Sequence, residues 1–376
     1  MIATVPDIIA KAPVTLLQSP MHQLECLNIV DEIIDGMDDK GILELMQGSG
    51  GDLDWVLDNL MKDTYQVMYT GDPNIDFAPK YTERLSQSIE ETLRTRNLTY
   101  FITSVMPDFQ LSWHHLEWGD LVHRYNKLCI NAARDHGKSY YFSNAYCAWK
   151  LYSYAKPKSS VFSARPTKSN SNRGYLFSFS LQQSVDLMEI LKGTIESNDI
   201  LKDRLYPDSR NSGAWASTNI VCRNGARLTC KGFGSSVRGA HPYWIVVDDG
   251  LKDNVIYSAL QRQKSIDYFH AVIMNMLVPG GQIIVVGTPF HASDLYGDLR
   301  SKSIFATHNK KGWFVIEYPA IFPDGRILWP QRWSFFDLMD KKATQGNIIF
   351  SRENLCRPIT NEASIFPLKV LERSLL

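Results

Sequence analysis

Hydrophobic positions along the chain follow two different patterns, and the change between them falls near residue 110. Before that point, apolar residues recur every three or four positions, as in the series Leu24, Leu27, Val30, Ile33 and Ile34, and again in Leu53, Val56, Leu57 and Leu60. This spacing is typical of helices with one apolar face. The sequence therefore predicts a helical N-terminal region over residues 1–110.

Beyond residue 110, short apolar runs alternate with helical stretches. The runs predicted to be strands are Leu128–Ile130, Gly174–Ser180, Ile245–Val247, Ile283–Val286 and Trp313–Glu317. Helices are expected over Lys138–Tyr154 and Gln182–Ser197, and Asn224-Gly225 is a strong turn signal between two strands of a hairpin, Asn219–Cys222 and Arg227–Lys231. This alternation predicts an α/β domain over residues 111–360, with a mainly parallel sheet flanked by helices.

Charge is distributed unevenly, although the formal net charge is zero. Residues 1–110 carry 18 acidic and 7 basic side chains, whereas residues 111–376 carry 22 acidic and 33 basic ones. The basic part fits a polyanionic partner or simply a solvated surface. Residues 150–173 contain six lysines and arginines and no acid, which fits either a DNA-facing loop or a solvated linker.

Several classes of protein are disfavoured by what the sequence does not contain. No apolar run approaches the roughly 18 residues of a membrane span, and the N-terminus has no secretory signal pattern. The six cysteines form no CxxC pair, which favours buried thiols in a reducing compartment over a zinc site. We therefore expect a cytoplasmic protein without a membrane partner.

A phosphate-binding loop is predicted where Ala133-Arg134-Asp135-His136-Gly137-Lys138-Ser139 follows a strand and opens a helix. Backbone N–H groups and the helix N-terminus favour bound phosphate in that setting. Lys138 is expected to reach the β- and γ-phosphates of ATP, and Ser139 to hold Mg²⁺, while Gly137 permits close approach of the backbone. Ala132 stands where the standard motif has glycine, so the match is imperfect.

Two further strand ends carry polar residues that suit nucleotide hydrolysis. The run Ile245–Val247 ends in Asp248 and Asp249, where Asp248 is expected to order Mg²⁺ and Asp249 to polarise the attacking water. Aspartate is one methylene shorter than the glutamate common at the second place. Thr288 follows the run Ile283–Val286 and is a candidate sensor of the γ-phosphate. The ordered set of Lys138, Asp248 and Thr288 indicates a nucleotide hydrolase.

The aromatic stretch Trp113–Trp118 precedes the phosphate-binding loop. It allows two interpretations, a surface on which adenine stacks or a helix packed on the sheet. His114 and His115 are adjacent in the sequence, so we expect their side chains to face differently and to make a poor metal pair.

These motifs together resemble the large terminase subunit of tailed phages. The similarity covers about residues 110–365 and includes Val237-Arg238-Gly239 and Gly-Thr-Pro-Phe-His from Gly287, with Asp294-Leu295-Tyr296. It implies a RecA-like, additional-strand (ASCE) P-loop ATPase whose deviant loop carries Arg134 four residues before the lysine. It also implies that Arg238 is an arginine finger presented to a neighbouring subunit, while Arg134 acts on the phosphates or braces the loop.

The same resemblance implies a biological role. The chain is expected to pump viral double-stranded DNA into a procapsid as an ATP- and Mg²⁺-dependent ring of subunits, five by resemblance. Its expected partners are the portal protein and the small terminase subunit, and its expected location is the host cytoplasm, docked transiently on the portal. Residues 361–376 would begin a linker toward a nuclease domain of a longer protein.

Three other functions remain open on the sequence. A helicase or other nucleic-acid remodeller would use the same core, although it would need a second motor or strand-separating elements. A nucleotide-binding assembly protein that hydrolyses little ATP is compatible with the short Asp249. A small-molecule P-loop kinase would need a lid and a substrate pocket that the sequence does not show.

Overall fold

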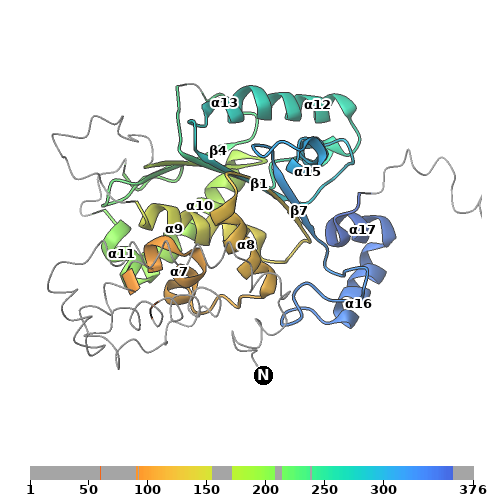
Figure 1. The fold of residues 1–376 in the computed structure, drawn as a ribbon, viewed down its shortest axis with the longest axis horizontal. Coiled ribbons are helices and arrows are strands. Elements are labelled where there is room, and N and C mark those ends of the chain that lie inside the picture. Colours follow the sequence, from red (N-terminus) through yellow and green to blue (C-terminus); the bar gives the residue numbers. More distant parts are fainter. Residues whose placement is uncertain are drawn as a thin grey trace, which may run out of the picture.

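Seven strands form one sheet at the centre of the domain in the computed structural model (Figure 1). The structure describes residues 60, 90–91, 93–154, 172–207, 214–237 and 239–358. The strands are β1 (Lys127–Ala132), β2 (Arg173–Ser178), β3 (Asn219–Val221), β4 (Arg227–Gly232), β5 (Trp244–Asp248), β6 (Gln282–Gly287) and β7 (Phe314–Tyr318). Their order across the sheet is β3-β4-β2-β5-β6-β1-β7, and β3 pairs antiparallel with β4 while the other neighbours are parallel.

The strand β6 lies between β1 and β5, which is the arrangement of the RecA-like additional-strand class. In the register of the sheet, Asn131 on β1 faces Gly287 on β6, and Asp248 on β5 faces Val286. Because the three strands are parallel, their carboxyl ends meet at one edge, the place where α/β sheets bind ligands. The segments that follow β1, β5 and β6 therefore converge there.

In the described part of the chain, helical segments cover one face of the sheet (Figure 1). They are α7 (Leu98–Val105), α8 (Trp113–Arg124), η1 (Tyr140–Tyr146), α9 (Cys147–Tyr152), α10 (Leu181–Ser197) and α11 (Asp199–Leu205). Their apolar side chains form one hydrophobic cluster with residues from alternate positions of the strands, among them Leu128, Ile130, Val246, Ile284 and Val286. Burial of this large aromatic and aliphatic surface is the main stabilising contribution on that side.

The opposite face is covered by η2 (Asp253–Val255), α12 (Ala259–Tyr268), η3 (Phe269–Ile273), α13 (Met274–Met276), α14 (Leu295–Ser301) and α15 (Ile304–Thr307). They pack on the other set of strand residues, including Ile245, Val247 and Val285. Beside β7 stand α16 (Phe335–Gln345) and α17 (Asn347–Leu355), whose Leu338 and Phe350 form a small third cluster with Ala133 and Ala320.

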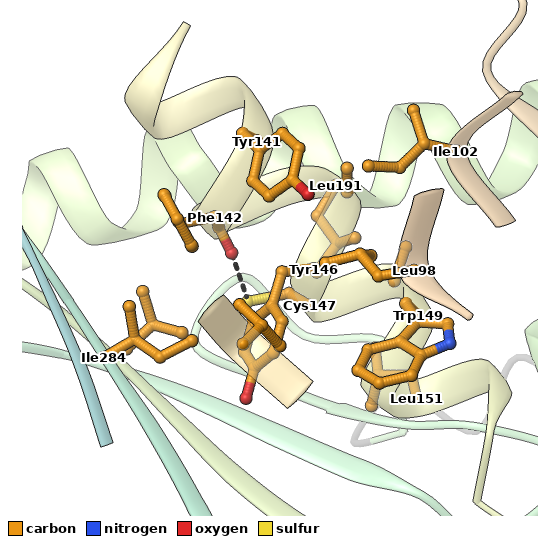
Figure 2. Packing of buried hydrophobic residues seen from close by; sticks show 14 of the residues in the cluster. Leu98, Ile102, Tyr141, Phe142, Tyr146, Cys147, Trp149, Leu151, Leu191 and Ile284 are labelled. Carbon is orange, nitrogen blue, oxygen red and sulfur yellow. Dashed lines mark hydrogen bonds between the residues drawn. The ribbon is translucent and has the colours of Figure 1, made fainter. Parts of the chain in front are cut away.

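The helix that follows the predicted phosphate-binding loop starts with a wide turn. Residues Tyr140–Tyr146 adopt a π-helix before the chain continues as α9, and the Cys147 thiol donates to the carbonyl oxygen of Phe142 at 3.2 Å (Figure 2). Such turns are rare and often occur at functional sites. Phe142 and Tyr146 are fully buried beside Ile284 of β6, so this helix is anchored in the core.

The predicted fold class is confirmed, with a mainly parallel sheet between layers of helices. Each predicted strand is present within a few residues, and the hairpin around Asn224-Gly225 is β3–β4. Most of the predicted N-terminal helical region, most of the basic stretch 150–173 and residues 361–376 lie outside the described residues. In the described part of the chain, no helix has the length and apolar character to cross a membrane, and five cysteines are buried and free.

Candidate functional site

The predicted phosphate-binding loop leaves β1 and enters the helix through two left-handed residues. Asp135 has φ 65° and Gly137 φ 82°, which turns successive peptide groups sharply. A Cβ on Gly137 would lie 2.8 Å from Nε2 of His115 and 3.4 Å from Trp329. Glycine is therefore required here both by its backbone angle and by the buried side chains beneath it.

Lys138 connects this loop to the strand β6. Its buried ammonium group donates to the carbonyl oxygens of Ala132 and Ala133, at 2.5 and 3.1 Å, and to the hydroxyl of Thr288 at 3.0 Å. The predicted lysine and the predicted sensor are therefore in direct contact, although 150 residues separate them in the sequence.

Asp248 lies at the end of β5 and is buried against the helix that follows the loop. The Ser143 hydroxyl donates to its Oδ2 at 2.6 Å, whereas Oδ1 is buried and accepts no hydrogen bond. Burial, reinforced by the charge of Asp249, raises the pKa of Asp248 to about 7, and the hydrogen bond from Ser143 opposes that rise. A buried carboxylate with one unsatisfied oxygen next to a serine hydroxyl suits a divalent cation.

A magnesium ion at this position would have few protein ligands. Within the described ranges no three His, Cys, Asp or Glu side chains gather closely enough to hold a metal. Mg²⁺ commonly binds through one or two protein oxygens, phosphates and water. Asp248 and Ser139 therefore fit a phosphate-bound Mg²⁺ better than a metal held by the protein alone.

Asp249 adopts a backbone conformation that aspartate rarely uses. Its φ is 44°, its amide donates to the carbonyl oxygen of Val286 at 3.0 Å, and its side chain is exposed to the cleft. A Cβ on Gly287 would collide with the Tyr296 hydroxyl and lie 2.8 Å from Oδ1 of Asp249. The acid, the glycine and the tyrosine therefore approach one another closely.

The segment after Thr288 is held in place by Asp294, which is fully buried. Its carboxylate accepts from the amides of Phe290 and His291, at 2.8 and 3.0 Å, and from those of Tyr296 and Gly297, at 2.9 and 3.1 Å. Four N–H donors satisfy a buried carboxylate well. Asp294 thus links the segment after Thr288 to the first turn of α14.

An open cleft of about 700 Å³ runs along the carboxyl ends of the strands. Its lining includes Arg134, Asp249, Thr288 and Glu353, together with residues of the segment that follows β5. Three of the predicted catalytic residues therefore share one cavity. Arg134 extends into solvent with 66% of its side chain exposed and lies 3.6 Å from the carboxylate of Glu353 on α17.

The C-terminal helical pair braces the phosphate-binding loop from outside. Lys341 on α16 pairs with the Asp135 carboxylate at 2.7 Å, and the indole of Trp333 lies over the ring of His136. The amide of Arg134 donates to the carbonyl oxygen of Glu353 at 2.8 Å. Movement of α16 and α17 would therefore displace the loop directly.

The aromatic stretch Trp113–Trp118 forms the first half of α8, and His114, His115 and Trp118 are buried. Packing in the core, the second of the two interpretations above, is what the structure shows. The expectation that the two histidines face differently is wrong, since their ring centroids are 3.9 Å apart. Their packing in one aromatic cluster below the loop draws both rings to the same side. Burial lowers the pKa of His115 to about 3 and that of His136 to about 4.

Two contributors to this site were not identified from the sequence. Ser143 lies four residues after Ser139, a helical spacing that places two hydroxyls on one side, so a signal for it was present. Glu353 reaches the cleft only through the tertiary fold. Arg238 lies outside the described residues, so its predicted role stays a prediction.

The sheet order defines an additional-strand α/β domain, in which the predicted phosphate-binding loop follows β1. No protein-family model and no curated protein matches the sequence. Among solved structures, the large terminase of bacteriophage HK97 aligns with a TM-score of 0.48 at 13% identity, over 70% of this chain and 55% of that one. The large terminase of a thermophilic bacteriophage, in complex with ADP, aligns with a TM-score of 0.38 at 9% identity, over 67% and 51%.

The large terminase ATPase domain of Thermus phage P74-26 aligns with a TM-score of 0.39 at 14% identity, over 69% of this chain and 98% of that domain. This chain thus spans about half the length of the HK97 protein and of the ADP-bound terminase.

Proposed function

We propose that this chain is an ATP-hydrolysing motor that moves viral double-stranded DNA into a procapsid. The observation that carries the enzymatic part is the meeting of Lys138, Thr288 and the Asp248–Asp249 pair at adjacent carboxyl ends of one parallel sheet. Arg134, Asp249 and Thr288 line the same cleft, which gives a bound triphosphate both cationic and acid–base groups.

Each group has a task that follows from its surroundings. Lys138, buried beside the loop carbonyls, is placed to exchange those contacts for phosphate oxygens. Asp249 faces the cleft and would polarise the attacking water as general base. Thr288, bonded to Lys138, would register the γ-phosphate, and Arg134 would stabilise the charge that develops on it.

Asp248 and Ser139 would hold Mg²⁺. There the ion would supply positive charge that offsets the charge of bound phosphate. Ser143 keeps the buried Asp248 in place through one carboxylate oxygen and leaves the other available. The carboxylate is therefore oriented before any ligand arrives, which reduces reorganisation during the reaction.

The motor part of the proposal rests on the joint order of the motifs and the basic character of residues 111–376. DNA would be held through its phosphates, since a translocating motor must ignore sequence. We further propose a ring, five subunits by resemblance, that presents Arg238 in trans and docks on a portal with a small terminase subunit in the host cytoplasm. Nuclease activity would belong to a longer chain.

One variant tests the enzymatic assignment. Lys138→Ala should abolish Mg²⁺-dependent ATP turnover, while the circular dichroism spectrum and melting temperature stay close to those of the unaltered chain. Lys202→Ala, on the exposed surface of α11, is the matched control and should hydrolyse ATP normally. Normal turnover by Lys138→Ala would remove the phosphate-loop assignment.

A second candidate, a nucleotide-binding assembly protein with little hydrolysis, is favoured by one observation. Asp249 has a short side chain on a left-handed backbone, so its carboxylate has limited freedom to reach a water molecule. Tight ATP binding with turnover that stays negligible when DNA and portal are added would favour this candidate over the motor.

A further inference from the structure

An apolar groove lies between the C-terminal helical pair and the segment that follows β7. Its cavity measures about 280 Å³. The walls are formed by Ile321 and Phe322 after β7, by Phe335 and Met339 on α16, and by Phe350 on α17. Phe335 and Met339 are four positions apart, so their side chains leave the same face of α16. The groove therefore presents apolar side chains from both of its walls.

The polar part of the lining is basic. Eight of the ten lining residues are apolar, and the other two are Lys342 on α16 and Arg357 after α17, which we call the basic rim. No acid among the described residues pairs with either of them. An apolar ligand that carries an acidic group at its edge is therefore the chemistry that suits this groove.

The helical pair has a small apolar core. Within the described ranges, its buried cluster consists of Ala133, Ala320, Leu338 and Phe350. Phe335, which lines the groove, is 48% exposed. Exposed aromatic surface beside an open apolar groove is typical of an interaction site. A ligand seated in the groove would therefore extend this cluster and cover Phe335.

The chain itself contains a segment of this chemistry close to the groove. Residues 359–376 lie outside the described residues. Their sequence includes Ile365-Phe366-Pro367-Leu368, four apolar residues in succession, and Glu362 is the only charged residue between Pro358 and Leu368. Arg357, two positions before residue 359, lines the groove. The apolar segment is thus tethered next to the groove.

We propose that residues 362–368 dock in this groove, with Phe366 as the apolar anchor and Glu362 at the basic rim. An aromatic side chain is the usual anchor of such a pocket. The nine residues from Arg357 to Phe366 span up to about 30 Å when extended, which is ample for a groove that Arg357 itself lines. A short tether gives an effective concentration in the millimolar range, so docking within one chain is favoured over docking of a second copy. Docking needs no nucleotide and is independent of the proposed function.

Hydrogen–deuterium exchange of the whole chain, measured without nucleotide, tests the docking. Phe366→Asp places a charge where an apolar anchor is needed, and Leu375→Asp is the matched control in the same C-terminal stretch. Amides of α16 should exchange at least about threefold faster in Phe366→Asp, because an empty groove lowers the local stability of the helix. Amides of β1 and β6 should be unaffected, and Leu375→Asp should match the unaltered chain.

A charge exchange tests the orientation of the docked segment. Glu362→Lys should also speed exchange in α16, but less than Phe366→Asp does, since a partly exposed ion pair contributes little. Lys342→Glu alone should have a similar small effect. The double variant, Glu362→Lys with Lys342→Glu, should exchange more slowly than either single variant. Additive effects in the double variant would contradict the placement of Glu362 at the basic rim.

Two results would overturn the docking itself. One is unchanged exchange of α16 in Phe366→Asp. The other is protection of α16 that increases with protein concentration, which would assign the groove to a second copy. If circular dichroism shows that Phe366→Asp is poorly folded, Phe366→Ala should give the same local increase by less. Exchange in α16 should be equally protected in Lys138→Ala, so failure of the phosphate-loop assignment and failure of the docking are distinguishable.

Discussion

Ser143 donates a hydrogen bond of 2.6 Å to Oδ2 of Asp248, and both residues are buried. The bond joins the π-helix after the phosphate-binding loop to the end of β5. It fixes the orientation of a carboxylate whose pKa is raised to about 7 mainly by burial. Since a hydrogen bond to the charged form opposes that rise, Ser143 helps to keep Asp248 able to bind a cation at neutral pH.

Replacing Ser143 by alanine should weaken the magnesium dependence of ATP hydrolysis. Loss of a hydrogen bond to a buried charged group costs on the order of 1–3 kcal/mol, so we expect the Mg²⁺ concentration for half-maximal turnover to rise about tenfold. A magnesium titration of turnover at saturating ATP measures this. Ser197→Ala, at the exposed end of α10, is the control. An unaltered magnesium curve would mean that Ser143 serves packing alone.

Gly287 separates the hydroxyl of Tyr296 from the carboxylate of Asp249, and no larger residue fits between them. Gly287→Ala should therefore displace Asp249 or Tyr296 and lower kcat by at least about tenfold. Nucleotide binding through Lys138 should be nearly retained, since the lysine contacts other atoms. Stopped-flow turnover and calorimetric affinity separate the two effects.

Gly193 provides the matched control for that substitution. It lies within α10, and a Cβ there would meet no atom within 4 Å. Alanine at this place should preserve turnover and raise the free energy of unfolding by about 1 kcal/mol, the helix propensity difference between alanine and glycine. Equal kcat values for the two alanine variants would contradict the crowding that we describe around Asp249.

His136, within the phosphate-binding loop, makes the domain sensitive to acid. Burial lowers the pKa of His136 from 6.5 to about 4, so the unfolded chain binds a proton at pH 5 that the folded chain does not. The contribution of His136 to the free energy of unfolding is therefore fully present above pH 6.5. It is lost as the pH falls toward 4, by about 1.2 kcal/mol per pH unit near pH 5.

His136→Asn removes the proton uptake while an amide can replace the hydrogen bond between Nδ1 and the Arg134 carbonyl oxygen, which measures 2.8 Å. In urea unfolding at pH 7, 6 and 5, the free energy of unfolding should then fall less steeply as the pH decreases. The difference in slope should correspond to about one proton fewer taken up on unfolding. His308→Asn is the control, because His308 is exposed and its left-handed backbone suits asparagine. A slope equal to that of the unaltered chain would exclude His136 as the source.

Much of the fold could be predicted because the central strands are buried on both sides. Ile245–Val247 and Ile283–Val286 are continuous apolar runs, which is the pattern that helices on both faces of a parallel sheet impose. The β3–β4 hairpin was marked by Asn224-Gly225, and Gly225 has φ 89°. The π-helix after Lys138 could not be predicted, since its residues have the same apolar spacing as an ordinary helix.

The candidate site could likewise be predicted only in part. Lys138, Asp248 and Thr288 follow strands, so their convergence followed from the rule that parallel strands end at one edge. Glu353 comes 219 residues after Arg134 and reaches it only because α17 packs beside β7. No local pattern reports such a contact. The burial of His114 and His115 likewise depends on Trp329 and Tyr318, which lie far along the chain.

The proposed trans action of Arg238 can be tested by mixing two inactive variants. Arg238→Ala should bind ATP with nearly unchanged affinity but lose hydrolysis in the assembled state, because its neighbours receive no finger. Asp249→Asn should bind ATP and fail to activate water. Each variant retains what the other lacks, so a site in an Arg238→Ala subunit becomes complete beside an Asp249→Asn subunit.

The amount of ATP turnover restored in the mixture shows whether Arg238 acts across the subunit interface or not. In a head-to-tail ring formed from an equal mixture, about one interface in four combines an intact Asp249 with an intact Arg238. Turnover near a quarter of that of the unaltered ring is therefore expected for a finger in trans. Asp249→Asn mixed with Lys138→Ala, which offers fingers but no competent site, should stay inactive. If the mixture of Arg238→Ala and Asp249→Asn is equally inactive although sedimentation shows assembled rings, Arg238 does not act across the subunit interface.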